Sequence, residues 1–332
     1  MKRFLVDTAK FGAIIAGQVI ILFLLYLIFD PFKVLRIYDD YSYPYVIPNR
    51  DFISTEMFIL NQPKYQYNSF IFGSSRTIAF RPDSWQKFLT KDNRIFMFDA
   101  SSESIFGIYT KLKYLESKNI KIKNAFIVFC RDVTFGLTHD HMGHLFIKHP
   151  EVSGSGDIHF QKTFLKAYFD PKFLINFYAY KIVGGYRPYM AGYIEKRTIR
   201  YNTVNNQINL VDQEAEIRNP EAYYSKRSNM FNRRIPDKMD TAQIKQQIQL
   251  TMLKEIKRIL EKNQTNYRIV ISPLYDQIQL NREDFKILKN LFGENVFDFS
   301  GKNAFTDSKF NYFESSHYRP MVGDSIFKIV YK

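Results

Sequence analysis

The chain has 332 residues, of which 45% are apolar and 24% are charged, a balance that excludes a disordered polymer and predicts a globular body. The formal net charge of +14 suits an anionic partner, such as lipid headgroups, a surface polymer or nucleic acid. A single cysteine, Cys130, excludes an internal disulfide and a zinc site built from several cysteines. It falls in the apolar run 125–130, so we expect a buried thiol in a strand.

Residues 11–29 form a run of 19 residues without a charge. As a helix this run spans roughly 30 Å, the thickness of the hydrocarbon core of a bilayer. It ends in Asp30-Pro31 rather than in a small-x-small cleavage site, so we expect it to be retained as a transmembrane helix. Basic residues in segment 1–10 favour a cytoplasmic N-terminus, although Lys33 and Arg36 also follow the helix. The sequence therefore predicts a single-pass protein of the cytoplasmic (inner) membrane whose body is extracytoplasmic.

Beyond the predicted helix, residues 30–66 are rich in Tyr, Pro and Asp and predict a stalk that packs onto the body, which we expect to be one domain over 67–332. Apolar runs predict strands at 69–73, 94–100, 125–130, 268–272 and 295–299. Helical spacing predicts helices at 104–118, at 240–260 with Asp240 as cap, at 282–292 and at 322–331. This alternation predicts an α/β fold with a parallel sheet flanked by helices, interrupted by a long insertion at 133–239. In such a sheet the active site lies at the carboxyl ends of the strands.

The first predicted strand runs directly into Gly73-Ser74-Ser75-Arg76. A serine just past a strand end lies where backbone N–H groups converge, and these groups can stabilise an oxyanion. A turn glycine followed by a helix-capping serine is the structural alternative.

A second polar motif, Glu314-Ser-Ser-His317, precedes the last predicted helix. A carboxylate three residues before a histidine can orient the imidazole, which can then take a proton from a serine hydroxyl. The alternative is a surface loop with a solvated glutamate.

The two motifs together resemble the SGNH hydrolase superfamily, in which a Gly-x-Ser block follows the first strand and an acid-x-x-His block precedes the last helix. The chain is most similar to membrane-anchored members of the Gly-Ser-Ser type that act in D-alanylation of teichoic acids and acetylation of exopolysaccharides. The resemblance covers about residues 67–132 and 240–332. It implies a flavodoxin-like sheet, Ser75 as nucleophile, His317 as base and Glu314 as its acidic partner, with Ser74 in place of an aspartate.

Three positions depart from the pattern of that family. The acid is Glu314 rather than aspartate, residues 99–103 offer no clear match for an oxyanion-donor glycine, and Asp132 falls where the family has a donor asparagine. An ionised aspartate cannot donate a hydrogen bond, so either Asp132 has another role or the oxyanion hole rests on backbone N–H groups. We count Ser74, Arg76 and Asp132 as candidate substrate-binding residues.

The insertion adds two features. Four of the six histidines lie in 139–149, and we expect His139, His141 and His144 to contact substrate near Ser75 rather than to bind a metal; satisfied loop histidines are the alternative. Residues 161–200 hold ten aromatic residues and eight Lys or Arg against two acids. An extracytoplasmic location argues against nucleic acid, so this segment suits membrane-interface docking or an anionic glycan; a subdomain core with a solvated cationic face is the alternative.

The sequence thus predicts a membrane-anchored acyltransferase or esterase that acts on ester groups of a cell-surface glycan or anionic polymer through a Ser-His-Glu triad, without a cofactor. A multi-spanning membrane O-acyltransferase is an expected partner, because the anchored relatives work with such enzymes. The rival hypothesis is a non-catalytic accessory or glycan-binding scaffold protein.

Overall fold

The computed structural model describes residues 1–231 and 233–332. Within these residues the body is an α/β domain built on a five-stranded sheet in the order β2-β1-β3-β6-β7, in which every neighbouring pair is parallel. The strands are β1 (Ser69–Gly73), β2 (Ile95–Met97), β3 (Asn124–Phe129), β6 (Asn266–Ile271) and β7 (Val296–Asp298). All five predicted strands are therefore confirmed, as is the parallel sheet flanked by helices.

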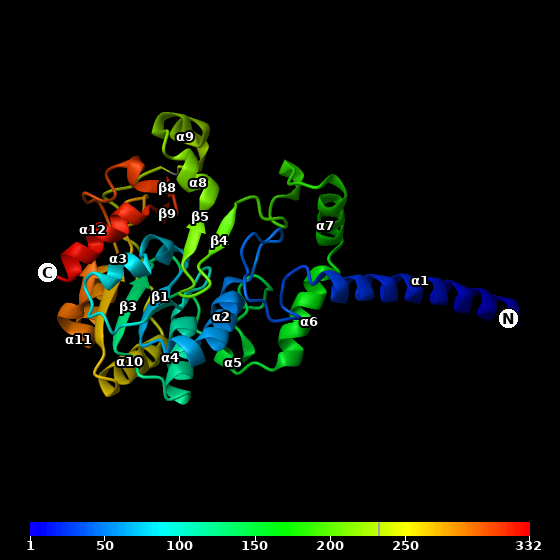
Figure 1. Ribbon diagram of the computed structural model, residues 1–332, viewed down its shortest axis with the longest axis horizontal. Coiled ribbons are helices and arrows are strands. Elements are labelled where there is room, and N and C mark those ends of the chain that lie inside the picture. The colour runs from blue at the N-terminus through cyan, green and yellow to red at the C-terminus, as the bar shows by residue number, and fades with distance from the viewer. Residues whose placement is uncertain (232) are drawn as a thin grey trace.

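Helices cover both faces of this sheet (Figure 1). Alternate residues of β1 point to opposite sides: Phe70 and Phe72 belong to one apolar core and Ile71 to the other. The first core is closed by α2 (Arg50–Tyr65), α4 (Ile105–Ser117), α10 (Gln247–Lys262) and α11 (Arg282–Phe292). The second core is closed by α3 (Pro82–Gln86) and α12 (Pro320–Val330). Because both faces are buried, the strands are continuously apolar rather than alternating.

The chain order of the strands reverses between β1 and β3. From β1 the chain passes to β2 on one side of the sheet, and then returns to β3 on the other side. A crevice at the carboxyl ends of the strands is expected at such a switch point. Residues that follow β1 and β3 therefore meet there.

The N-terminal helix α1 (Lys2–Phe29) projects away from the body (Figure 1). It is the one described helix that is long and apolar enough to cross a membrane, and only 6% of its most apolar 18-residue window is buried. It is therefore no core helix of the domain.

The expected stalk is in large part a core helix. Residues 50–65 form α2, whose first six residues, among them Arg50 and Asp51, are all buried. Asn49 caps the helix by accepting a hydrogen bond from the Phe52 N–H at 2.9 Å. The polar composition of this segment misled the prediction, because its charged residues are paired inside the domain.

The long helix expected from Asp240 begins later, at Gln247, with Gln246 as its cap. The N–H groups of Gln243 and Ile244 donate to the Asp284 carboxylate at 2.7 and 3.0 Å, which holds that segment outside the helix. Asp240 itself pairs with Arg131 at 2.7 Å, so it does not cap the helix.

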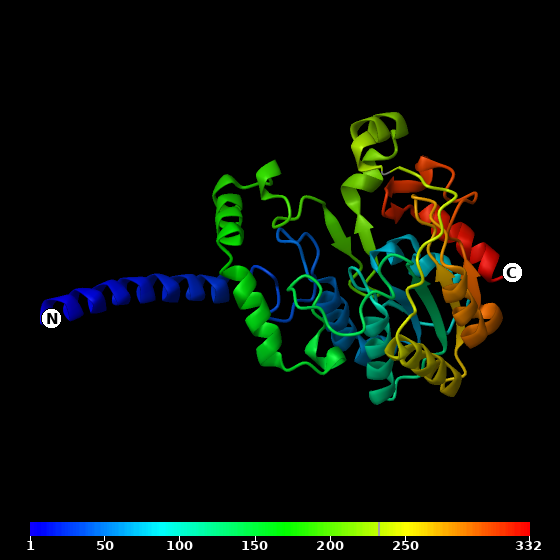
Figure 2. The same cartoon turned by 180° about the vertical axis from the view of Figure 1, so that it is seen from behind.

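The first part of the insertion, through α7 (Pro171–Val183), lies between the sheet and α1 (Figure 2). Short helices, 3-10 turns and two small hairpins make up the insertion and the remaining connections. They are α5 (Pro150–Ser153), α6 (Asp157–Tyr168), α7 (Pro171–Val183), η2 (Pro188–Met190), β4 (Ile199–Tyr201), β5 (Ile208–Leu210), α8 (Val211–Glu216), α9 (Pro220–Lys226), η3 (Ser228–Met230), η4 (Gly293–Asn295), η5 (Lys309–Asn311), β8 (Tyr312–Glu314) and β9 (His317–Tyr318).

Candidate active site

A tight turn at the end of β1 carries the candidate nucleophile. Gly73 ends the strand with φ +144°, and a Cβ at this position would lie 2.7 Å from the Val128 carbonyl oxygen on β3. Only glycine fits such a conformation and such a close approach. The 3-10 turn η1 (Ser75–Ala79) starts two residues later, so the chain leaves the sheet abruptly.

Burial singles out Ser75 within this turn. Every residue of 69–80 is buried except Ser75, which is partly exposed. Ser74 is buried; its Oγ accepts a hydrogen bond from the Arg76 N–H at 3.4 Å and lies 3.3 Å from the Cys130 Sγ. Ser74 therefore caps the turn, and the predicted buried thiol packs behind it.

The hairpin β8–β9 carries the other two candidates. Glu314 ends β8 and His317 begins β9, so a two-residue turn places both side chains on the same side. The Glu314 Oε2 accepts from the Ser316 N–H at 2.7 Å, and the Glu314 Oε1 is hydrogen-bonded to the His317 Nδ1. The carboxylate thus holds both the turn and the imidazole ring.

The structure brings Ser75 to this hairpin. The Ser75 Oγ lies 2.8 Å from the His317 Nε2, although the two residues are 242 positions apart in the sequence. With Glu314 on the opposite ring nitrogen, the serine, histidine and carboxylate form a continuous hydrogen-bonded chain. This is the geometry that a base needs to take a proton from a hydroxyl.

The electrostatic surroundings favour an ionised Glu314. Burial raises the pKa of Glu314, but the hydrogen bond and charge of His317, with the Ser316 N–H and the charge of Arg76, outweigh this effect and leave the pKa below its ordinary value. An ionised carboxylate at this place stabilises the imidazolium that forms when His317 takes a proton.

Arg76 connects the three loops of the site. Its guanidinium makes a bidentate pair with Asp132, at 2.7 and 3.0 Å, just after β3. Its Nε donates to the Ser316 carbonyl in the β8–β9 turn at 3.0 Å. Arg76 is 8% exposed, so it acts mainly within the fold, between the nucleophile turn and the histidine hairpin.

The side chain of Asp132 is engaged by Arg76. Both of its carboxylate oxygens accept hydrogen bonds from Arg76, so it serves as the partner of that guanidinium. A candidate oxyanion donor that remains is the backbone N–H of Ser75, which donates no hydrogen bond to any group among the described residues. The geometry thus gives Asp132 another role, the first of the two alternatives that the sequence left open, and the backbone oxyanion hole stays a prediction.

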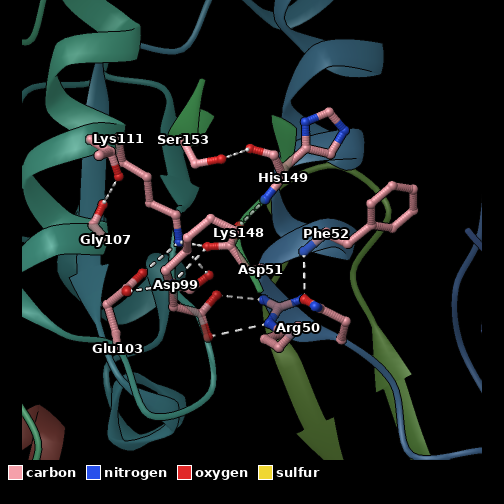
Figure 3. A network of polar contacts seen from close by, with 12 residues as sticks. Arg50, Asp51, Phe52, Asp99, Glu103, Gly107, Lys111, Lys148, His149 and Ser153 are labelled. Carbon is pink, nitrogen blue, oxygen red and sulfur yellow. Dashed lines mark hydrogen bonds and ion pairs between the residues drawn. The ribbon is translucent and has the colours of Figure 1, made fainter. Parts of the chain in front are cut away.

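A buried charge network, defined by Asp51, Glu103, Lys111 and Lys148, joins the start of α2 to α4 (Figure 3). Each lysine contacts both carboxylates, at distances of 2.5–3.2 Å, and all four side chains are at most 1% exposed. Each charged side chain of this network therefore has two partners of opposite sign.

Asp99 links this network to Ser74 and η1. Its backbone carbonyl accepts from the Lys111 Nζ at 2.9 Å, and its carboxylate pairs with Arg50 at 2.6 Å. The Thr77 hydroxyl lies 3.2 Å from the Asp99 carboxylate and 2.9 Å from the Ser74 carbonyl. In the sequence, Asp99 begins the segment 99–103 that offers no match for an oxyanion-donor glycine. In the structure, its carboxylate holds Thr77 and so helps to fix the turn that carries Ser75.

A cavity of about 350 Å³ opens beside the triad and contacts it through Glu314 and His317. The insertion supplies most of its wall. The apolar part includes Ile47, Ile78, Ile194, Leu210 and Phe313, and the polar part includes Glu195, Arg197 and Gln213. No sequence pattern marks these residues, because nothing local distinguishes them from neighbouring apolar or polar positions.

The three loop histidines lie apart from this cavity. None of His139, His141 and His144 belongs to its described lining. His144 lines a second cavity of about 510 Å³ with Lys162 and Lys166, and its ring lies 5.2 Å from that of Phe32. His144 thus packs toward α6, and the expected contact of these histidines with substrate stays a prediction. Among the described residues no group of three or more His, Cys, Asp or Glu is placed to hold a metal ion.

Comparison with protein-family profiles finds no match, and comparison with curated proteins finds none either.

Proposed function

We propose that this chain is a membrane-anchored serine acyltransferase or esterase, of the SGNH type and with a flavodoxin-like sheet, that acts on ester groups of a cell-surface glycan or anionic polymer. The observation that carries the proposal is the hydrogen-bonded chain from the Ser75 Oγ through His317 to Glu314, at the carboxyl end of β1. Both the strand order and the position of the serine support the resemblance drawn from the two sequence motifs.

The chemistry follows from these contacts. The Ser75 Oγ attacks the acyl carbon while the His317 Nε2 takes the hydroxyl proton, and Glu314 stabilises the resulting imidazolium. The Ser75 N–H stabilises the oxyanion. His317 then returns the proton to the leaving alcohol, which departs as the acyl-enzyme forms. Water or a sugar hydroxyl attacks the acyl carbon of that ester and gives its proton to His317. His317 passes the proton to the Ser75 Oγ as the bond from that oxygen to the acyl carbon breaks, and the acid or the new ester leaves.

The anchor supports a location at the membrane. In the proposal α1 spans the cytoplasmic (inner) membrane with its basic N-terminus inside, and the domain lies outside. A site held near the bilayer suits an acyl group supplied by a multi-spanning O-acyltransferase, and exclusion of water from the cavity favours transfer over hydrolysis.

The test is covalent labelling of the full-length protein in detergent with a fluorophosphonate probe. The probe labels the wild type and fails to label Ser75→Ala, while Ser74→Ala, the adjacent serine, keeps labelling because its hydroxyl is buried. Labelling that survives in Ser75→Ala reassigns the nucleophile. No labelling of the folded wild type rejects the enzyme in favour of a non-catalytic accessory or glycan-binding scaffold.

That second candidate function has one observation in its favour. Asp132, paired with Arg76, offers no oxyanion donor where the family pattern has one. A scaffold would bind the glycan or polymer through the same cavity without forming an acyl-enzyme.

A further inference from the structure

The corner between α6 and α7 contacts α1 well before that helix ends. The Tyr168 hydroxyl lies 2.9 Å from the Leu22 carbonyl oxygen and 2.7 Å from the Tyr178 hydroxyl. The rings of Tyr26 and Tyr168 are 4.9 Å apart. Part of the body is therefore fixed against the side of the anchor and not only against its end.

The position of Leu22 sets the depth of this contact. Leu22 lies seven residues before Phe29, so it is roughly 10 Å along the helix axis from the end of α1. If residues 11–29 occupy the hydrocarbon core, the Tyr168 corner reaches below the membrane surface. If Leu22 lay at that surface instead, only residues 11–22 of the charge-free run would remain, roughly 18 Å of helix. That is too short for a core of about 30 Å, and Lys10 and Asp7 would have to enter it.

The composition of helix α7 suits a position below the membrane surface. Between Lys172 and Lys181 it has no charged residue. One side packs on the protein: Phe173 and Phe177 are buried, and the Phe177 ring lies 6.0 Å from that of Phe29 at the end of α1. A helix that is apolar all round is normally covered on all sides.

The other side of α7 is left uncovered in the described structure. Ile175 is 68% exposed and Ile182 is 85% exposed, and their spacing of seven residues places them on the same face. Val183 continues this patch at 46% exposure. In Figures 1 and 2 α7 runs across the direction of α1, as a helix in the plane of a bilayer would if α1 crossed that bilayer upright.

Lysines border the apolar face. Segment 157–183 has four lysines and two aspartates. Lys162 and Lys166 are exposed on α6, and Lys172 is exposed at the start of α7. An apolar face with flanking lysines is the pattern of a helix that lies in the headgroup layer of an anionic bilayer, about 5–10 Å deep.

We propose that α7 and the α6–α7 corner dock into the headgroup layer of the same bilayer that α1 spans, with Ile175, Ile182 and Val183 against the lipid. The occupant of this surface is lipid because the surface is continuous with the anchor. The inference rests on the membrane-anchoring part of the proposed function and is independent of the triad chemistry.

Docking has a consequence for the candidate active site. Tyr186, Ala191 and Gly192, which follow α7 directly, line the cavity beside His317. With α7 held in the headgroup layer, this wall of the cavity faces the membrane. Substrate or acyl donor then reaches Ser75 from the lipid side.

The test uses the full-length chain reconstituted in vesicles of phosphatidylglycerol and phosphatidylethanolamine. The single native thiol, Cys130, is 0% exposed, so an introduced surface cysteine is the only site that a thiol-reactive fluorophore labels. Ile182→Cys carries the fluorophore, and the quencher is a lipid with a spin label near the top of its acyl chain. Ile329→Cys on α12, an exposed isoleucine at the opposite end of the molecule, is the matched control.

Fluorescence at Ile182→Cys is quenched at least about threefold more than at Ile329→Cys, because only the former probe lies among acyl chains. A third variant, Ile20→Cys, reports on the anchor itself. If Ile20→Cys is quenched and Ile182→Cys behaves like Ile329→Cys, docking is rejected while the anchor stands. If Ile20→Cys is not quenched either, membrane anchoring fails, and this inference fails with it. Ile175→Cys repeats the measurement should Ile182→Cys fold poorly.

Discussion

Two clusters of ionisable side chains, the buried charge network and the triad, differ in what surrounds them. In the buried charge network of Asp51, Glu103, Lys111 and Lys148 every side chain is at most 1% exposed and meets two partners of opposite charge. In the triad, His317 and Glu314 are 23% and 18% exposed and border a cavity.

The two clusters differ in whether any group is left free to react with another molecule. Because every side chain of the network is buried and paired, none is free to bind a substrate. Removing one of them leaves a buried charge with too few partners of opposite sign. The triad has a hydroxyl at its partly exposed end, and in the proposed reaction the positive charge on His317 forms only when it takes the proton of that hydroxyl. Changes in the network should therefore affect stability, whereas changes in the triad should affect activity.

The largest expected effect is that of His317→Ala on activity. Without the imidazole nothing takes the proton of Ser75, so hydrolysis of a small chromogenic ester falls by about 10⁴-fold or more. Stability measured by chemical denaturation changes little, because the His317 ring is partly exposed. Loss of both folding and activity would place His317 with the structural cluster instead.

Glu314→Gln has the next largest expected effect. A neutral amide cannot stabilise the imidazolium and can hold the ring in the wrong tautomer, so turnover falls by about 10³–10⁴-fold. Fluorophosphonate labelling becomes slower, and denaturation shows the fold to be retained. Turnover close to wild type in this variant would show that another acid orients His317.

Lys148→Met tests the network. It leaves Asp51 and Glu103 with Lys111 as their only lysine, so the free energy of unfolding falls by about 3–5 kcal/mol. The control, Lys123→Met, breaks an ion pair whose lysine side chain is 43% exposed and costs under about 1 kcal/mol. Equal losses in the two variants would contradict a special role for burial.

The pH dependence of stability sharpens this test. Burial raises the pKa of Asp51, but Lys111 and Lys148 lower it by more, so the folded value lies below the ordinary one. Asp51 therefore stabilises the fold above about pH 4, and this contribution is lost as the pH falls through the folded pKa.

Lys148 shows the opposite behaviour. Burial lowers its pKa, but Asp51 and Glu103 raise it by more, so its contribution is complete below about pH 10 and is lost as the pH rises through the folded pKa. We expect the stability gap between wild type and Lys148→Met to be constant from about pH 5 to 9 and to shrink below about pH 4. Denaturation curves across this range measure it; a gap that is the same at low pH would mean that the network is not ionised.

The smallest expected effect is that of Asp132→Asn. The amide keeps one hydrogen bond to Arg76 but loses the charge, and Arg76 still holds the Ser316 carbonyl. Esterase activity should stay within about tenfold of the wild type. A loss as large as that of Glu314→Gln would make Asp132 part of the reacting system rather than a partner of Arg76.

Much of the fold could be predicted because burial leaves a local mark on the sequence. The run at 69–73 is continuously apolar because both of its faces are covered, and β1 occupies these same residues. The helix at 282–292 has a regular apolar face and an asparagine cap, and α11 has these bounds. The segment at 50–65 was missed because its polar residues, read without their partners, indicate solvent.

Local sequence patterns were enough to predict the apolar helix α1, the strands of the parallel sheet and the pairing of Glu314 with His317, because each depends on neighbours within a few residues. Tertiary structure alone decided the contact between Ser75 and His317, the pairing of Asp132 with Arg76, the burial of Asp51 and the place of His144 beside α6. A side chain forms hydrogen bonds and ion pairs only with groups that the fold places within about 3 Å of it. Such contacts join residues from distant parts of the chain, so no local sequence pattern predicts them.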